Sequence, residues 1–266
     1  MTTTWVQRRN NLAERLLVRP RVDRSSWQSG AAPSPVYELD DVVLCGRVNP
    51  SPTEWQTSTG ADLPWAETHF QERVSGQPLN PAPSYIDWPW HSEKYKEEYK
   101  GVGWKNRHNR QSPFDHTYPE RMWPKLAGGS DEFLYGIRFD YGDLQDVVNL
   151  LAKDPFTRQA YLPIWFPEDT GSTAGQRVPC TLGYHFIRKG AHLDMKYFIR
   201  SCDITRHFHN DVYMAGRLLH WVVAAVQDGR DTYGAPYVGN LTMFISNLHM
   251  FTADAWRYNQ DGSPKQ

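Results

Sequence analysis

The chain has 266 residues, of which 39% are hydrophobic and 14% aromatic, enough apolar material for one large folded domain. Its 29 Lys and Arg residues are balanced by 30 Asp and Glu residues, which excludes the strong basic excess of a general nucleic-acid-binding protein. The longest apolar stretch, residues 218–226, is interrupted by His220 and falls far short of the ~20 residues of a membrane helix. We therefore expect neither a membrane partner nor a stable nucleic-acid partner.

The first eleven residues, MTTTWVQRRNN, lack the apolar core of a signal peptide. The three cysteines, Cys45, Cys180 and Cys202, do not form a disulfide framework and lack the CxxC spacing of a metal site. A reducing cytoplasm is the location that this pattern favours.

The N-terminal third is irregular in pattern. Residues 1–35 are polar and Arg-rich and end near GAAPSP, so they are predicted to form an arm, and residues 36–266 a single globular domain. The stretch VYELDDVVLCG, residues 36–46, is predicted as a strand or a short helix. Residues 49–60 and 76–90 are rich in Pro, Ser, Thr and Asn and are predicted as loops.

Residues 88–123 are charged and aromatic and are predicted as a long loop, a type of segment that is usually functional.

The C-terminal half has clearer periodicity. DLQDVVNLLAK, residues 143–153, has apolar residues at helical spacing and is followed by Pro155, which predicts a helix. The other predicted elements are a strand at 159–166, a β-hairpin of 180–187 and 192–200 around Lys189-Gly190, a buried helix at 211–227 and a last strand at 239–251. Helices and hairpins mixed in this way predict an α+β fold around one sheet.

Two segments of the predicted hairpin carry reactive side chains. Cys180 follows Pro179 at the start of one strand, and Arg200-Ser201-Cys202-Asp203 ends the other. A nearby guanidinium lowers the pKa of a thiol and so favours the nucleophilic thiolate, and Arg with Ser suits a phosphate. The alternative is that Cys180 is a buried core cysteine and Arg200 a surface ion pair.

A metal site is not expected. His207 and His209 form an HxH pair that can bind zinc on a strand, but no third ligand has a suitable spacing.

Four motifs in order resemble the thymidylate synthase family. DPFTR (154–158) resembles the family's DPxSRR, Pro179-Cys180 its PC, RSCD (200–203) its RSxD, and GNLTMFISNLHMF (239–251) its GDxxxxxxDxHxY. Ser201 lies 21 residues after Cys180 and Asp211 lies 31 residues after it, as in the family. The resemblance covers residues 154–251.

The resemblance implies a mixed β-sheet flanked by helices and a homodimer that forms through the sheet face. It also implies that Cys180 attacks C6 of a pyrimidine nucleotide, so that C5 becomes a carbon nucleophile toward 5,10-methylenetetrahydrofolate, the co-substrate. Small-molecule nucleotide and folate are then the partners.

The resemblance also implies roles for the neighbouring residues. Arg200 and Ser201 would hold the 5′-phosphate, and Arg158 would reach the same phosphate from the other subunit. Asp203 would orient the backbone or the folate, and His249 would contact the 3′-hydroxyl of the sugar.

Three further roles depend on weaker matches. The family's upstream Glu, which relays protons through water, is assigned to Glu67 in PWAETHF, with Glu72 as the alternative; otherwise these residues form a solvated helix face. Tyr118 in HTYPERMW would help to remove the C5 proton, or is a packed aromatic residue. The family's RTGT phosphate loop is not visible, and Arg47 in CGRVNPS is the substitute.

The first departure from the family concerns the base. The uracil-binding Asn falls on Asp211, and a carboxylate can only accept hydrogen bonds, whereas an amide both donates and accepts. Asp211 therefore favours the N4 amino group of cytosine, as in the dCMP and CMP hydroxymethylases of the family. Two alternatives stay open: a slip of one residue would put Asn210 there, or Asp211 is the N-cap of the next helix.

The second departure is the C-terminus. The 15 residues after Phe251 are polar, whereas thymidylate synthases continue into an apolar tail that closes over the folate. Hydride transfer needs water excluded, and hydroxymethylation needs it admitted, so this ending favours water addition.

The third departure concerns the sugar and the phosphate. Ser201 and Arg158 match the deoxynucleotide enzymes, but Phe251 replaces the Tyr that helps to bind the 3′-hydroxyl, and Gln159 replaces the second Arg. We expect dCMP rather than CMP without excluding CMP. The expected activity is C5 hydroxymethylation of dCMP or CMP; the alternatives are a thymidylate synthase, a dCMP methyltransferase, or a non-catalytic pyrimidine-nucleotide-binding or RNA-binding relative.

Overall fold

The computed structural model describes residues 3–25, 33–90, 116–126, 142–170, 178–227 and 234–265. Its centre is a six-stranded sheet of order β1-β2-β6-β5-β4-β3. The strands are β1 (Val22–Ser25), β2 (Pro33–Arg47), β3 (Tyr161–Pro163), β4 (Thr181–Lys189), β5 (His192–Asp203) and β6 (Tyr237–Phe251). Only β5 and β6 pair in parallel. The sheet is therefore mixed and confirms the predicted α+β class.

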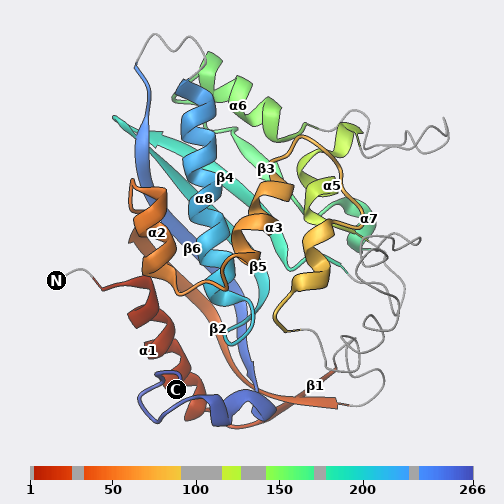
Figure 1. Cartoon of the computed structure of the whole chain (residues 1–266), viewed down its shortest axis with the longest axis vertical. Coiled ribbons are helices and arrows are strands. Elements are labelled where there is room, and N and C mark those ends of the chain that lie inside the picture. Colours follow the sequence, from red (N-terminus) through yellow and green to blue (C-terminus); the bar gives the residue numbers. More distant parts are fainter. Residues whose placement is uncertain are drawn as a thin grey trace.

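Helices pack around the longest one, α8, which lies against β5 and β6 (Figure 1). The α-helices are α1 (Trp5–Leu17), α2 (Pro52–Thr59), α3 (Trp65–Arg73), α5 (Tyr118–Met122), α6 (Leu144–Lys153), α7 (Pro167–Thr170) and α8 (Phe208–Gln227). The 3₁₀ helices are η2 (Pro83–Asp87), η4 (Pro124–Leu126) and η7 (Thr252–Arg257). β5 and β6 run in parallel, so the chain returns along the sheet between them, and α8 is part of this connection. The first turn of α8 therefore lies at the end of the sheet where β5 finishes.

A close approach between α2 and α8 fixes the position of α8. Trp55 of α2 is buried, and its indole N–H donates to the Tyr213 carbonyl oxygen at 3.0 Å. A Cβ atom at Gly216 would lie 2.2 Å from the Trp55 ring, so only glycine fits there. This contact holds the site-bearing end of α8 against the N-terminal half of the chain.

The helix at 143–153, the β-hairpin, the buried helix and the last strand that were predicted in the C-terminal half are confirmed. The β4–β5 hairpin turns at Gly190, which has φ of +58°, and α8 and β6 cover the predicted helix and last strand. Helix α6 begins after Asp143, whose carboxylate accepts the backbone N–H of Asp146, while the Asp146 carboxylate accepts that of Asp143. Residues 36–46 belong to strand β2, not to a short helix.

Three predictions about the chain were wrong. Residues 5–17 of the expected arm form α1, and its buried face of Trp5, Leu12, Ala13 and Leu16 is part of the core. Residues 52–59, expected in a loop, form α2 after the Ser51 cap. The strand expected at 159–166 is limited to Tyr161–Pro163. Most of the expected long loop at 88–123 lies outside the described residues.

Among the helices that the structure describes, none combines the length and apolar character needed to cross a membrane.

Candidate active site

Cys180 lies directly before β4, and Arg200 of β5 lies beside it. Arg200 Nε donates to the Pro179 carbonyl oxygen at 2.8 Å, and Arg200 Nη2 lies 3.9 Å from Cys180 Sγ. The guanidinium carbon also stacks 5.6 Å from the centre of the Trp165 ring. Cys180 is exposed. The alternative of a buried core cysteine is therefore wrong, and the guanidinium is placed where it favours the thiolate.

Tyr118 is the next side chain of this group. The Thr181 hydroxyl donates to Tyr118 Oη at 3.2 Å and is 2.9 Å from Tyr197 Oη, so Thr181 links α5 to the start of β4, next to Cys180. Burial raises the pKa of Tyr118, and the negative charge of the Cys180 thiolate raises it further. The structure thus brings together the two residues predicted for nucleophilic attack and C5 proton removal.

Asp211 belongs to the same group. Helix α8 begins at Phe208, so Asp211 lies inside the first turn and is not the N-cap. The Cys202 thiol donates to Asp211 Oδ2 at 3.7 Å. Burial raises the pKa of Asp211 to about 6, and the positive charge of Arg73 opposes this rise.

Asn210, the alternative base-reading residue, faces a different neighbour. It is 1% exposed, its Nδ2 donates to Asp62 Oδ2 at 2.9 Å, and its Oδ1 accepts the Asp62 backbone N–H at 2.9 Å. Both ends of the amide are therefore occupied by the loop between α2 and α3. Asp211, not Asn210, shares contacts with the residues around Cys180.

The other predicted ligands lie where three strands end together. In the sheet register, Ser201 is level with Asn247, and Asp203 with His249. Asp203 is buried and accepts the backbone N–H of Thr205 at 2.8 Å. Burial raises the pKa of Asp203 to about 6.

His249 lies between Asp203 on β5 and Glu38 on β2 in the register. Burial lowers the pKa of His249 to about 4, so the imidazole is neutral near pH 7. A neutral imidazole has one donor and one acceptor nitrogen, which suits a sugar hydroxyl. The Phe251 ring packs edge-on against it at 5.4 Å.

Glu67 and Glu72 have hydrogen-bond partners outside this group. Desolvation acts to raise the pKa of Glu67, but hydrogen bonds from Arg217, Tyr213 and Gln71 outweigh it and lower the pKa. Glu72 is buried and accepts the Ser84 backbone N–H at 2.6 Å. Within the described part of the chain, neither carboxylate contacts Cys180, Tyr118 or Asp211, and the proton-relay role of either stays a prediction.

Arg47 lies at the other end of the sheet. Arg47 pairs with Asn240 of β6, whereas Ser201 pairs with Asn247 of the same strand. The two pairs are therefore seven residues apart along β6. At ~3.3 Å per residue this separation is roughly 23 Å. Within one subunit, Arg47 therefore does not join the group around Arg200 and Ser201.

Arg158 is exposed, and its carbonyl oxygen is 3.0 Å from His185 Nε2. The side chain lies on the surface before β3, a position that a second subunit can reach. Its role across a dimer stays a prediction.

Arg24 of β1 is a cation that the sequence interpretation missed. Its guanidinium donates to both carboxylate oxygens of Glu38, at 3.0 and 2.6 Å, and Glu38 also accepts from Asn247 Nδ2 at 3.2 Å. Arg24 therefore lies at the Ser201 end of the sheet. The signal was its sequence, Arg24-Ser25-Ser26, in which two hydroxyl residues follow an arginine as in RTGT but without the glycine.

Arg73 at the end of α3 was also missed. Its guanidinium carbon lies 4.0 Å from the centre of the Tyr118 ring, and the side chain is buried. In the sequence it stands in the charged run ETHFQER, which is typical of a solvated helix face.

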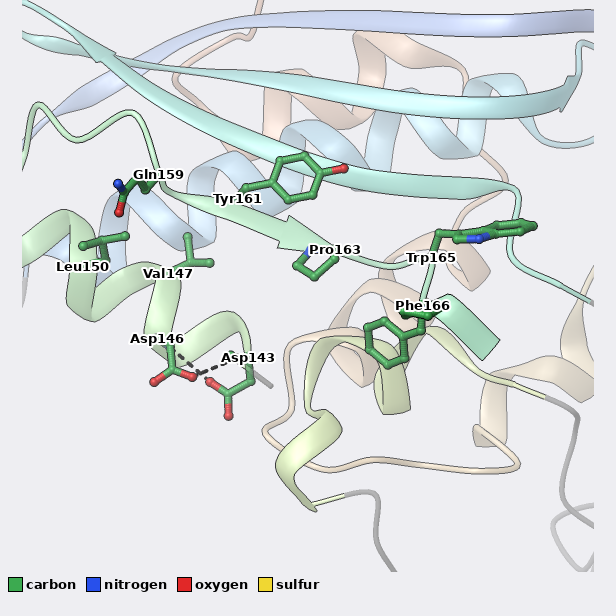
Figure 2. A pocket seen from close by; sticks show the side chains of 11 residues that line it. Asp143, Asp146, Val147, Leu150, Gln159, Tyr161, Pro163, Trp165 and Phe166 are labelled. Carbon is green, nitrogen blue, oxygen red and sulfur yellow. Dashed lines mark hydrogen bonds between the residues drawn. The ribbon is translucent and has the colours of Figure 1, made fainter. Parts of the chain in front are cut away.

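A cavity of about 390 Å³ lies next to this group, between α6 and the β3 segment. Figure 2 shows Val147 and Leu150 of α6 on one side and Tyr161, Pro163 and Trp165 on the other. Trp165 connects the cavity to the site because its ring also contacts Arg200. Cys180 does not line this cavity, whose walls are mostly apolar.

The two histidines of the HxH pair have separate partners. His207 stacks on Trp88 with ring centres 5.3 Å apart, and His209 Nε2 is 3.0 Å from Asp62 Oδ2. The described residues contain no group of three or more His, Cys, Asp or Glu side chains arranged to hold a metal ion.

The family model described as thymidylate synthase matches residues 92–259, well over half of the chain, and this range contains Cys180, Arg200 and Asp211. No curated protein matches the sequence significantly. The motifs, the mixed sheet and the placement of the thiol beside Arg200 agree with the family match. The chain therefore belongs to the thymidylate synthase family, whose members carry out folate-dependent one-carbon transfer to a pyrimidine nucleotide.

Proposed function

We propose that the protein is a cytidylate C5 hydroxymethylase, which transfers a one-carbon unit from 5,10-methylenetetrahydrofolate to dCMP or CMP and adds water to give the hydroxymethyl group. The observation that carries this proposal is the pair of contacts at the start of α8. Asp211 faces the Cys202 thiol and the residues around Cys180, while the amide of Asn210 is bound on both sides by Asp62.

The chemistry of Asp211 favours cytosine. A carboxylate accepts hydrogen bonds from the N4 amino group and from N3 when N3 is protonated, and it repels the lone pairs of a uracil O4. With a pKa of about 6, Asp211 is mainly ionised near pH 7. An amide at this position would instead match uracil through one donor and one acceptor.

The covalent step begins with the Cys180 thiolate. Its sulfur bonds to C6 of the pyrimidine, and the electron pair of the 5,6 double bond moves to C5. C5 attacks the methylene carbon of the folate, whose bond to one of its two nitrogens breaks, and that nitrogen takes up the electron pair. Tyr118 lies next to Thr181 and helps to remove the C5 proton. Tetrahydrofolate then leaves, water adds to the exocyclic carbon, and the Cys180–C6 bond breaks.

Nucleotide binding is assigned to the end of the sheet. Arg200, Ser201 and Arg24 bind the 5′-phosphate, and Arg158 of a second subunit adds a further cation. Asp203 orients the backbone or the folate, and the neutral His249 binds the 3′-hydroxyl of the sugar. The presence of Cys180 at the position of the family's nucleophile argues against a non-catalytic binding protein, because binding alone does not require a thiolate.

A homodimer is part of the proposal. Exposed and half-exposed apolar side chains lie on strands of the sheet: Phe198 and Phe244 stack with ring centres 5.1 Å apart, Tyr161 lies beside Phe198, and Val43 is exposed. Helices α1, α2, α3 and α6 pack against α8 (Figure 1). We assign this apolar area to the contact with the second copy.

A product assay tests the function directly. The enzyme is given [5-³H]dCMP, [5-³H]CMP or [5-³H]dUMP with methylenetetrahydrofolate, tritium release is counted, and products are identified by mass. We expect release from dCMP or CMP with a hydroxymethyl product, and the ratio of the two rates assigns the sugar. Release from dUMP alone with a methyl product would make the protein a thymidylate synthase, and a methylated cytosine would make it a dCMP methyltransferase.

The Asp211→Asn variant tests the base assignment in the same assay. We expect its preference to move from cytosine toward uracil nucleotides, because an amide supplies the donor that O4 needs. An unchanged preference would refute the role given to Asp211.

A further inference from the structure

The most unusual buried charge among the described residues is Arg73. Its side chain is 4% exposed, its guanidinium lies over the Tyr118 ring, and its Nη2 is 3.1 Å from His69 Nε2. Its buried Nε has no hydrogen-bond partner, and no carboxylate of the described residues lies within 4.0 Å of the guanidinium. A buried cation without a paired anion costs free energy, which points to a more distant negative charge that interacts with Arg73.

Asp211 is the anion on which Arg73 acts. Groups from four elements interact electrostatically with Asp211: Arg73 of α3, Tyr118 of α5, Tyr184 of β4, and Tyr197 and Cys202 of β5. Burial raises the pKa of each of the three tyrosines and of the thiol, so all four are uncharged near pH 7. Of these five groups, Arg73 is therefore the one that carries a charge.

His69 holds the guanidinium in place. Its ring stacks on Trp65 at 5.1 Å, and its Nδ1 is 2.9 Å from the Ser84 hydroxyl, so its Nε2 accepts from Arg73 when the ring is neutral. Burial, and then the charge of Arg73, lowers the pKa of His69 to about 4. The neutral histidine orients Arg73 without competing for the negative charge of Asp211.

We infer that Arg73 is a specificity-determining, positioning residue, which keeps Asp211 as a carboxylate and so maintains the preference for cytosine over uracil. This inference rests on the proposed function, in which Asp211 binds the base. A protonated carboxyl group has one donor and one acceptor, like an amide, and would accept uracil. Without Arg73, Asp211 would remain in place but would be protonated at a higher pH.

The first test needs no substrate. The Asp211 carboxyl is titrated in the free enzyme by isotope-edited infrared spectroscopy, with the Asp211→Asn spectrum used for assignment. We expect Arg73→Met to shift the titration upward by about 1 pH unit or more, and Arg73→Lys, which keeps the charge, to shift it much less. The Arg73→Met side chain is similar in length and apolar, so it suits the buried position.

Arg188→Met is the matched control. Arg188 is also buried and also stacks over an aromatic ring, Phe156, but it lies at the far end of β4 and donates to the carbonyl oxygens of Gly190 and Gly234. This variant should leave the Asp211 titration unchanged. An Arg73→Met titration equal to that of the unmodified protein would overturn the inference.

The second test measures base preference as the ratio of kcat/KM for dCMP to that for dUMP. At pH 7 we expect Arg73→Met to lower this ratio about tenfold, since one pKa unit changes the ratio of ionised to protonated carboxyl tenfold. The ratio should recover at pH 8.5, where Asp211 ionises again, and Arg73→Lys should retain it.

The double variant Arg73→Met, Asp211→Asn separates the two proposals. It should have the same base preference as Asp211→Asn alone, because Arg73 acts through the carboxyl group. A shifted titration with an unchanged base preference would refute the specificity role. An unmodified enzyme that prefers dUMP would refute the proposed function, while the titration would still report whether Arg73 governs the charge of Asp211.

Discussion

The three cysteines differ in the groups around their sulfur atoms. Cys180 is exposed beside Arg200, Cys45 is exposed beside the Thr242 hydroxyl, and Cys202 is buried, with a pKa raised by desolvation and then by the negative charge of Asp211. A thiol is a nucleophile as its thiolate, which a guanidinium stabilises and burial disfavours. Only Cys180 combines access with a neighbouring cation.

We therefore expect Cys180→Ala to abolish tritium release from C5-labelled nucleotide, and Cys45→Ala to leave it unchanged. Iodoacetamide should also inactivate the enzyme by alkylating Cys180, and bound nucleotide should protect it; mass spectrometry of the peptides identifies the site. Full tritium release by the Cys180→Ala protein would contradict the covalent mechanism.

At the scale of elements, α5 is tied to α7 by one buried ion pair. The side chains of Arg121 and Asp169 are 3% and 6% exposed. Arg121 Nη1 donates to Asp169 Oδ2 at 2.9 Å, and Arg121 Nη2 donates to Asp169 Oδ1 at 2.8 Å. Asp169 also accepts the Phe166 backbone N–H at 2.8 Å. Because α5 carries Tyr118, this pair links the site to residues about 50 positions later in the chain.

Arg121→Met should lower the free energy of unfolding by about 3–5 kcal/mol, because it leaves the Asp169 carboxylate buried without its cation. Lys125→Met is the control, since its pair with Asp146 is exposed and is worth about 0–1 kcal/mol. Urea denaturation followed by tryptophan fluorescence measures both. Equal losses in the two variants would contradict the difference in burial.

Elements with strong periodicity were predictable from the sequence. Helix α6 has its apolar residues on one face and an Asp cap, and the β4–β5 hairpin has alternating side chains around a turn glycine. Helix α1 was missed because its buried Trp5, Leu12 and Leu16 are spread among arginines and asparagines, although Thr4 and Gln7 form a capping box. Helix α2 was missed because its Ser, Thr and Pro residues resemble a loop composition.

The residues of the candidate site also differ in whether they could be predicted from the sequence. Cys180 and Arg200 lie in contiguous motifs, and Asp211 lies at a preserved distance from Cys180, so all three were found by position. Arg73 and Arg24 reach the site only through tertiary packing. Arg73 has no local pattern that distinguishes it from a solvated arginine, and Arg24 has only the two hydroxyl residues that follow it. Burial and three-dimensional neighbours are properties that the composition of a short segment does not encode.

At the scale of the whole molecule, the proposed shared site has a direct consequence. Arg158→Ala and Cys180→Ala homodimers should each be inactive or nearly so. A mixed dimer restores one intact site from the Cys180 of one subunit and the Arg158 of the other, so an equimolar mixture should regain about a quarter of the unmodified activity. No recovery at any mixing ratio, with exchange of subunits verified by mass spectrometry, would contradict the contribution of Arg158 across the dimer.

The sheet order also constrains how the chain folds. β6, residues 237–251, lies between β2 and β5, so these strands become neighbours of a common partner only after nearly the whole chain has left the ribosome. Until then β1–β2 and β3–β4–β5 are two separate partial sheets, and the inner edges of β2 and β5 are open to pairing with other chains. Synthesis of the last strand is thus the step that joins the two halves, and pauses just before it are when newly made chains are most prone to aggregate.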